Sequence, residues 1–263
     1  MIILSYMKTK VISIIIIICF VAALLTALLF QLYYAPEYST LIAHRGYNYD
    51  VPGNTAMAFE KAGELGYTMV ENDIRYTKDN VLVVTHDPDI IFKDGTKKNV
   101  YDYTYEELLE KPLKNTKTKD DVYLLSFIDF LKICKAYNMF CLIEIKGDMP
   151  DEVLNILFNN IEEYYDKSQC EIQTFNLDLL IRAQQMHPEY KYMLTLANEG
   201  DWHVCFEYSF DINIRLFEIT QELVFEFHSR GLKVAVWTVD SIAGVKRFNR
   251  MKVDYILTNI VRP

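Results

Sequence analysis

The side chains of this sequence that could do chemistry gather in one segment, residues 41–87. His44 and His86 each follow a short apolar run, as residues at the ends of strands do. Between them the sequence alternates, so that Glu71 and Asp73 share one face of another strand. Two such carboxylates are half of a site for a hard cation, and histidine can donate or accept a proton near neutral pH. The segment therefore predicts a cation site flanked by two proton-transfer groups.

The elements that would position these residues are strands and helices in regular alternation. Predicted strands cover Thr40–Gly46, Met69–Thr77, Phe140–Lys146, Glu171–Phe175, Lys191–Leu196, Asp211–Leu216, Lys233–Val239 and Val253–Thr258. Predicted helices cover residues 54–65, with Asn54 or Thr55 as the cap, and Ser126–Tyr137, Pro150–Tyr165, Leu177–Met186, Thr220–Arg230 and Ser241–Met251. The strands are short and continuously apolar, as in a parallel sheet buried on both faces. About eight such units predict an α/β protein with a (β/α)8 TIM barrel.

An open doubly wound sheet is the alternative fold. Its first turn would carry the pattern G-x-G-x-x-G, which HRGYNYDVPGN lacks. The barrel also brings distant side chains together, because the C-terminal ends of its strands form one mouth, where active sites lie. The candidates at these ends are His44, Glu71, Asp73, Glu144, Lys146, Asn176, Trp237 and Thr258. The polar segment 87–118, with one helix near Tyr105–Glu110, is expected to cover part of the mouth.

Three of these candidates are carboxylates. Glu71, Asp73 and Glu144 together offer the oxygen ligands that Mg²⁺ or Ca²⁺ prefers. The alternative is that each carboxylate forms an ion pair with Arg75 or Lys146. Three carboxylates at one mouth are harder to neutralise in that way, so a divalent cation is the favoured interpretation.

The charge balance after residue 36 limits the partners of this chain. Apart from Lys8 and Lys10, all charged residues lie in this part, which carries 25 basic and 36 acidic residues, a net charge of −11. Such a balance argues against a nucleic-acid surface. An anionic substrate would need a local positive site, which a divalent cation with Arg45 and Lys146 could supply.

An ordered set of short motifs resembles the glycerophosphodiester phosphodiesterases. No single motif is specific, but the set runs in order through almost all of residues 40–261. The motifs are HRG at His44–Gly46, NT at Asn54–Thr55, E-x-D at Glu71–Asp73, TKD at Thr77–Asp79, HD at His86–Asp87, IEIKG at Ile143–Gly147, TFN at Thr174–Asn176, VWTVD at Val236–Asp240 and VDYILTN at Val253–Asn259.

The resemblance implies metal-dependent hydrolysis of a glycerophosphodiester to an alcohol and sn-glycerol 3-phosphate. It implies that Glu71, Asp73 and Glu144 are the metal ligands and that His44 and His86 are the acid–base pair. Arg45 and Lys146 are expected to hold the phosphate oxygens. Trp237 is expected to pack on the alcohol portion of the substrate, with a place in the core as the alternative.

Two other functions stay open at this point. A phosphatidylinositol phospholipase C-like enzyme would share the barrel and the histidine pair, and an inactive barrel could bind a lipid head group or an envelope polymer. The sequence also departs from the usual motifs, with Gly53 where glutamate is common, Asp240 where asparagine is common and Asn259 where aspartate is common.

The first 35 residues are expected to lie outside the globular domain, which would span residues 36–263. Residues 11–32 carry no charge, and at ~1.5 Å per residue a helix there would measure about 33 Å, enough to cross a bilayer. Because Lys8 and Lys10 precede this run, we expect a single transmembrane anchor with the domain outside the cytoplasm. A cleaved signal peptide is the alternative, with a secreted domain. Four cysteines of the domain, Cys134, Cys141, Cys170 and Cys205, are expected to be buried and free.

Overall fold

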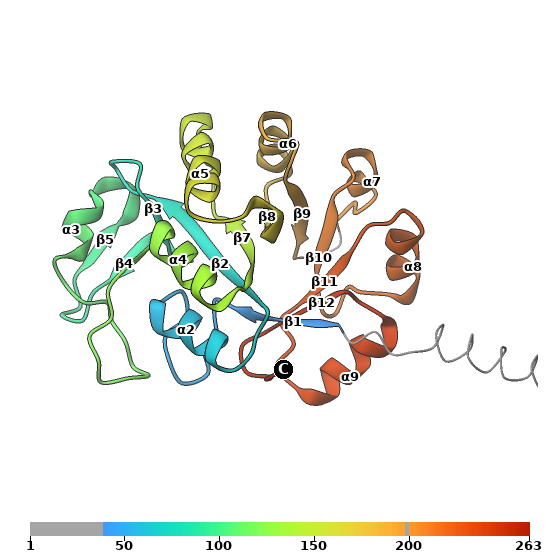
Figure 1. The fold of residues 1–263 in the computed structure, drawn as a ribbon, viewed down its shortest axis with the longest axis horizontal. Coiled ribbons are helices and arrows are strands. Elements are labelled where there is room, and N and C mark those ends of the chain that lie inside the picture. The colour runs from blue at the N-terminus through green and yellow to red at the C-terminus, as the bar shows by residue number, and fades with distance from the viewer. Residues whose placement is uncertain (1–38, 198–199) are drawn as a thin grey trace, which may run out of the picture. The chain divides into compact units, whose positions relative to one another are not determined.

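The computed structural model describes residues 39–197 and 200–263 (Figure 1). The predicted membrane span 11–32 and the predicted domain boundary at residue 35 lie outside these ranges. Among the described helices, none is long and apolar enough to cross a membrane.

Eight parallel strands form a closed barrel. Each pairs with the next, and closure comes from β1, which pairs with both β2 and β12. The strands are β1 (Thr40–His44), β2 (Met69–Tyr76), β7 (Phe140–Ile145), β8 (Cys170–Thr174), β9 (Lys191–Leu196), β10 (Asp211–Arg215), β11 (Val234–Trp237) and β12 (Tyr255–Thr258). The predicted TIM barrel is therefore confirmed.

Helices cover the outside of the barrel (Figure 1). They are α2 (Ala56–Glu64), α4 (Phe127–Tyr137), α5 (Asp151–Tyr164), α6 (Leu177–Met186), α7 (Val204–Tyr208), α8 (Gln221–Ser229) and α9 (Ile242–Met251), with a 3₁₀ turn η2 (Lys167–Gln169) before β8. Side-chain oxygens begin most of them, and Thr55, not Asn54, caps α2. Pro150 precedes the first turn of α5 with extended backbone and does not lie within it.

Two apolar layers hold the barrel together. The larger lies between strands and helices and contains the buried Cys134, Cys141, Cys170 and Cys205, as expected for the cysteines. A smaller cluster fills the barrel interior and includes Ile42, Leu142, Met193, Ala235 and Leu257. Because this interior is packed with side chains, the polar residues above it are held at the mouth.

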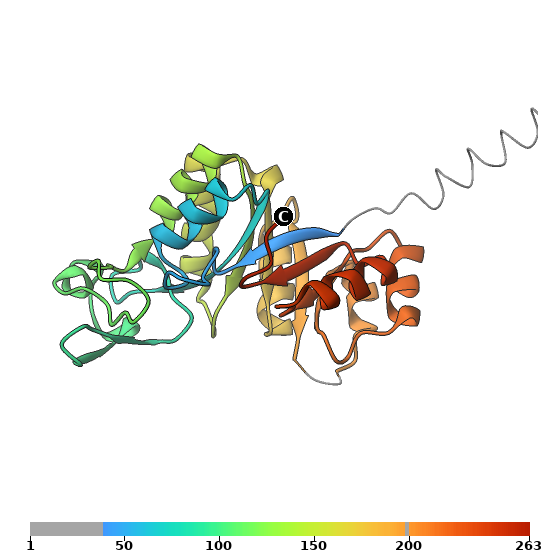
Figure 2. The same ribbon diagram turned by 90° about the horizontal axis from the view of Figure 1, so that it is seen from below.

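A long insertion follows β2 and projects to one side of the barrel (Figures 1 and 2). It contains β3 (Leu82–Val84), a hairpin of β4 (Asp89–Ile91) and β5 (Lys97–Asn99), a 3₁₀ turn η1 (Val100–Asp102), α3 (Tyr105–Leu109) and β6 (Leu125–Ser126). The predicted helix is confirmed as α3, which begins with a capping box of Thr104 and Glu107. The β4–β5 hairpin was not predicted, because its strands are three residues long and lack an alternating pattern.

The turn between β2 and β3 carries His86 back to the mouth. β3 runs antiparallel to β2, and the Thr85 amide donates to the Asp73 carbonyl at 2.9 Å. His86 therefore lies next to the residues of β2 although it does not end a barrel strand.

Candidate active site

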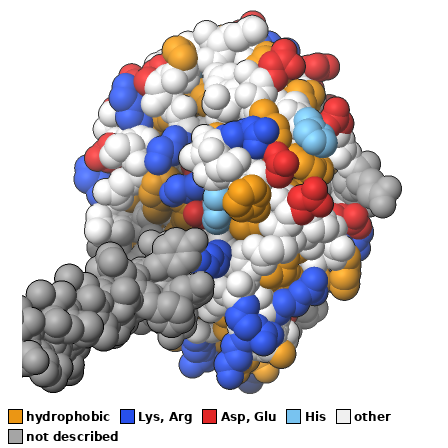
Figure 3. Space-filling model, turned by 90° about the vertical axis from the view of Figure 1, so that its right-hand side faces the viewer, with side chains coloured by type: hydrophobic (Ala, Val, Ile, Leu, Met, Phe, Trp, Pro, Cys, Tyr) orange, Lys and Arg blue, Asp and Glu red, His pale blue; other side chains and the backbone are white. Residues whose placement is uncertain are grey.

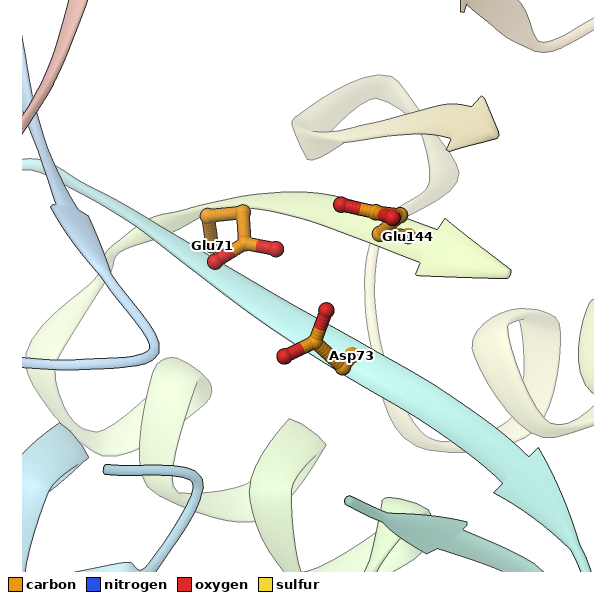
Figure 4. Close-up of side chains that lie close together, drawn as sticks. All are labelled: Glu71, Asp73 and Glu144. Atoms are coloured by element: carbon orange, nitrogen blue, oxygen red, sulfur yellow. The ribbon is translucent and has the colours of Figure 1, made fainter. Parts of the chain in front are cut away.

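Glu71, Asp73 and Glu144 converge at the mouth (Figure 4). The first two lie on β2 and the third on β7, where Asp73 and Glu144 are directly paired. Each offers a carboxylate oxygen within 4.8 Å of the others, and their residues are 0%, 0% and 5% exposed. Three buried carboxylates so close together require positive charge nearby.

Lys146 and Arg45 supply two positive charges. Lys146 Nζ lies 3.1 Å from Asp73 Oδ1 and forms an ion pair with Glu144 as well. Arg45 Nε lies 3.1 Å from Asp73 Oδ2. The alternative interpretation, in which ion pairs alone neutralise the carboxylates, therefore holds in part, because Lys146 pairs with both Asp73 and Glu144.

Arg75 does not pair with the carboxylates but with the segment around His86. Its guanidinium donates to the His86 carbonyl from Nε at 3.0 Å and from Nη2 at 2.8 Å, and from Nη1 to the Tyr101 hydroxyl at 2.7 Å. These bonds fix the segment that carries His86, and none of them goes to the three carboxylates.

Two cations do not balance three carboxylates, and the pKa values of the carboxylates reflect this imbalance of charge. Burial, Asp73 and Glu144 raise the pKa of Glu71 well above its ordinary value. Burial and Asp73 raise the pKa of Glu144 to about 7, against the opposing effect of Lys146. Burial also acts to raise the pKa of Asp73, but Lys146 and Arg45 outweigh it and hold that pKa below its ordinary value. Without a further cation the cluster therefore favours bound protons.

One oxygen of this cluster has no partner in the described part of the chain. Glu71 Oε2 accepts from the Arg45 amide at 2.9 Å, but the buried Oε1 has neither a hydrogen bond nor an ion pair. An unpaired buried carboxylate oxygen beside two further carboxylates fits a hard divalent cation. The three residues could therefore hold a metal ion.

His44 ends β1 beside the carboxylates. Its Nε2 lies 3.9 Å from Glu71 Oε2, and its Nδ1 lies 2.8 Å from Asn259 Oδ1. Burial, followed by the charge of Arg45, lowers the pKa of His44 to about 4. In this structure the imidazole is therefore neutral at neutral pH.

His86 is more exposed and has a different partner. Its Nδ1 lies 2.8 Å from Asp87 Oδ1. A carboxylate that is ionised can only accept, so Nδ1 donates, and Nε2 forms no hydrogen bond within the described part of the chain. The two histidines thus differ in the charge of the group that orients them.

Two cavities meet at His44, Arg45 and His86. A small one of about 120 Å³ is also lined by Glu144, Lys146, Phe175 and Trp237. Trp237 stands edge-on to Phe175, with ring centroids 5.7 Å apart. It lines this cavity and also packs against the apolar cluster of the barrel interior, so its position combines the two expectations, and its contact with the substrate stays a prediction.

The larger cavity, of about 710 Å³, extends between the loop after β1 and the insertion. Its further lining includes Asn48, Lys114, Lys117 and Asp240. The insertion therefore forms one wall of the site, as expected for a segment that covers the mouth.

Not every candidate from the sequence takes part. The Asn176 side chain accepts from the Leu179 amide and caps α6, and neither cavity is lined by it. Thr258 is buried and bonds to Asp240 instead.

Other polar residues of the site were not predicted from the sequence. Asn54 donates to Asp73 Oδ2 at 2.7 Å, and Gln173 donates to Glu144 Oε2 at 3.4 Å. Thr195 and Asn213 both donate to Gln173 in the barrel interior. The sequence feature that could have identified these interior residues is the presence of polar side chains within otherwise apolar strands.

Known proteins resemble this chain over most of its length. A relative from Caldanaerobacter subterraneus subsp. tengcongensis, a glycerophosphodiester phosphodiesterase, is 29% identical over 228 residues, covering 83% of this chain and 93% of the relative. One of the same name from Bacillus altitudinis is 24% identical and covers 83% and 94%.

Solved structures share the fold. A glycerophosphodiester phosphodiesterase from Parabacteroides distasonis superposes with a TM-score of 0.72 at 25% identity, covering 84% of this chain and 93% of that one. A phosphodiesterase from Oleispira antarctica, in complex with the product sn-glycerol-3-phosphate, has a TM-score of 0.75 at 17% identity and covers 84% and 93%. The sequence model of the glycerophosphoryl diester phosphodiesterase family matches residues 44–262, and this chain therefore belongs to that family.

Proposed function

We propose that this protein hydrolyses glycerophosphodiesters to an alcohol and sn-glycerol 3-phosphate with the aid of a divalent cation. The observation that carries the proposal is the buried trio of Glu71, Asp73 and Glu144, with one unpartnered oxygen, beside two oriented histidines. Family membership and the product complex of the Oleispira antarctica protein support the reaction.

Glu71, Asp73 and Glu144 would hold the cation, and Mg²⁺ or Ca²⁺ suits a set of oxygen ligands. When bound, it would act as a Lewis acid and neutralise negative charge on the phosphoryl oxygens. Arg45, which is partly exposed, and Lys146 would bind those oxygens as well, Arg45 through its forked donors and Lys146 as a point charge.

The histidines would move the protons. We assign the base to His44, because its Nε2 faces the carboxylate trio. It would take a proton from the attacking hydroxyl, of water or of the substrate's neighbouring alcohol, as that oxygen bonds to phosphorus. His86 would protonate the alcohol oxygen as its bond to phosphorus breaks, while Asp87 compensates the charge of the imidazolium. If the substrate's own hydroxyl attacks, water opens the cyclic product in a second step.

The two cavities would take the two halves of the substrate. We assign the small glycerol half to the cavity lined by Phe175 and Trp237, and the alcohol half to the larger cavity, which would accept alcohols of different size. This assignment differs from the expectation from the sequence, which placed Trp237 against the alcohol portion. We further propose that residues 11–32 anchor the protein in the cell membrane and that the domain lies outside the cytoplasm. This location is supported by the sequence pattern.

Activity of the full-length protein tests the function. With Mg²⁺ or Ca²⁺ it should release sn-glycerol 3-phosphate from glycerophosphocholine or glycerophosphoethanolamine, and chelator or Glu71→Gln should abolish the release. Turnover that survives both changes would remove the metal role. An inositol cyclic phosphate product without metal dependence would favour the phospholipase C-like alternative. Binding without turnover across a broad substrate set would favour a binding barrel.

A further inference from the structure

Three neighbouring strand ends join in a hydrogen-bonded chain behind His44. His44 ends β1, Asn259 follows β12, and Asp240 lies beyond the end of β11. In the sequence, Asp240 and Asn259 are two separate departures from the usual motifs. In the structure they contact each other, and Asn259 also contacts His44.

Asp240 fixes which way the Asn259 amide points. Asp240 Oδ1 accepts from the Asn259 backbone amide and Oδ2 from the Asn259 Nδ2, both at 2.7 Å. Because an ionised carboxylate offers no donor, the NH₂ group of Asn259 must face Asp240. Its carbonyl oxygen, Oδ1, is thereby turned toward His44.

The orientation of Asn259 in turn fixes the proton of His44. Oδ1 lies 2.8 Å from His44 Nδ1 and also accepts from Asn48 Nδ2 at 2.9 Å. A carbonyl oxygen can only accept, so Nδ1 carries the hydrogen. The Nε2 lone pair then faces Glu71 and the carboxylate trio.

Further bonds hold this chain in place. Asn48 Nδ2 also donates to the His44 carbonyl at 2.7 Å, and the buried Thr258 hydroxyl donates to Asp240 Oδ1 at 3.2 Å. The oxygen and the nitrogen of the Asn259 side-chain amide therefore both have partners, and these partners permit one orientation only.

We propose that Asp240 and Asn259 are positioning residues that hold His44 as the Nδ1–H tautomer with Nε2 directed to the reacting atoms. The inference rests on the proposed function, in which His44 is the base. The positioning requires one carboxylate and one amide at positions 240 and 259, but the carboxylate can stand at either position. If the two identities were exchanged, an aspartate at position 259 would accept from His44 directly and from the side-chain amide of an asparagine at position 240.

The exchange gives a sharp test. Asn259→Asp alone places two carboxylates in contact, and their repulsion should displace residue 259 from His44. Asp240→Asn alone removes the group that sets the amide's orientation. The double variant Asp240→Asn/Asn259→Asp restores an amide–carboxylate pair. If the two residues did not act through their contact with each other, their losses would be independent and would add in the double variant.

We would measure kcat and KM for glycerophosphocholine with the full-length protein and these three variants. Each single variant should lose about 10–100-fold in kcat, as is usual when a group that orients a catalytic side chain is removed, with KM within about threefold. The double variant should recover to within about fivefold of the original kcat. Asp201→Asn, which removes a carboxylate 2.9 Å from the exposed His203, is the matched control and should leave kcat unchanged. Additive losses, or unchanged kcat in Asn259→Asp, would overturn the proposal.

The tautomer itself can be observed without turnover. In protein with ¹⁵N-labelled histidine, the His44 signals are identified by their loss in His44→Gln, and the nitrogen shifts report which ring nitrogen is protonated. The original protein and the double variant should show Nδ1–H, and Asp240→Asn a mixture of tautomers. An Nε2–H tautomer in the original protein refutes the inference. Lack of turnover with an Nδ1–H tautomer that Asp240→Asn disturbs would refute the proposed reaction but keep the positioning. Circular dichroism would show whether each single variant folds. If one does not, the kcat of the double variant and the His44 tautomer of the original protein decide whether the proposal holds.

Discussion

Removal of the cation should make the stability of this protein depend on pH in a defined direction. The pKa of Glu144 is about 7 in the fold, against an ordinary value of 4.5, because of burial and Asp73. Between these values the folded protein binds more protons than the unfolded chain, so its stability falls as pH rises. At 1.36 kcal/mol per pH unit, the 2.5-unit window corresponds to about 3 kcal/mol, since Glu144 is almost fully buried.

Urea unfolding in the presence of chelator, at pH values from about 4 to 8, would measure this effect. The metal-free protein should lose about 3 kcal/mol of unfolding free energy from Glu144 by pH 8, and Glu144→Gln should be less pH-dependent by that amount. Mg²⁺ or Ca²⁺ should restore stability more at pH 7 than at pH 5, because the cation binds the ionised trio. If the metal-free protein gains stability between pH 5 and 7 relative to Glu144→Gln, the charge imbalance inferred for the trio is wrong.

Three further predictions concern single side chains. His86→Ala should lower kcat for glycerophosphocholine by about 10²–10⁴-fold but spare a diester with a p-nitrophenyl leaving group, which needs no proton, whereas equal losses would exclude the acid role. Gly46→Ala should unfold at lower temperature than Gly66→Ala, because both have positive φ but only at Gly46 would the added Cβ lie 2.6 Å from the Ala58 carbonyl carbon; equal melting temperatures would contradict this. Trp237→Ala should raise KM for glycerophosphocholine about tenfold, corresponding to about 1.4 kcal/mol, with kcat within threefold, and an unchanged KM would place the indole outside the binding site.

The sequence allowed the barrel to be predicted because most of its strands are short, largely apolar runs and most of them are followed by a helical pattern. The convergence of Glu71, Asp73 and Glu144 followed from that fold alone, since all three lie on barrel strands. The position of His86 did not follow in the same way. It depends on an antiparallel turn in the insertion, and a three-residue strand such as β3 leaves little periodic signal.

Contacts between loops could not be predicted from the hydrophobic periodicity of the sequence either. Asp240 and Asn259 are 19 residues apart and lie on different strand ends, so nothing local in the sequence joins them. The only sign of this contact in the sequence was that the two departures from the family motifs exchange an acid and an amide. The exchange is explained by the structure, in which the two side chains are hydrogen-bonded to each other. Likewise, the sequence permits either Asn54 or Thr55 as the helix cap. In the structure Thr55 takes that position, and the Asn54 side chain donates to Asp73 instead.

The charges of the site explain how an acidic domain could bind an anion. The surface in Figure 3 mixes acidic and basic side chains, and the chain after residue 36 has a net charge of −11. At the mouth, three carboxylates face Arg45 and Lys146, which leaves one negative charge when all are ionised. A divalent cation would turn this into one positive charge, equal and opposite to that of a phosphodiester. Metal binding and substrate binding should therefore be coupled, because without the cation the trio would repel the substrate or retain protons instead.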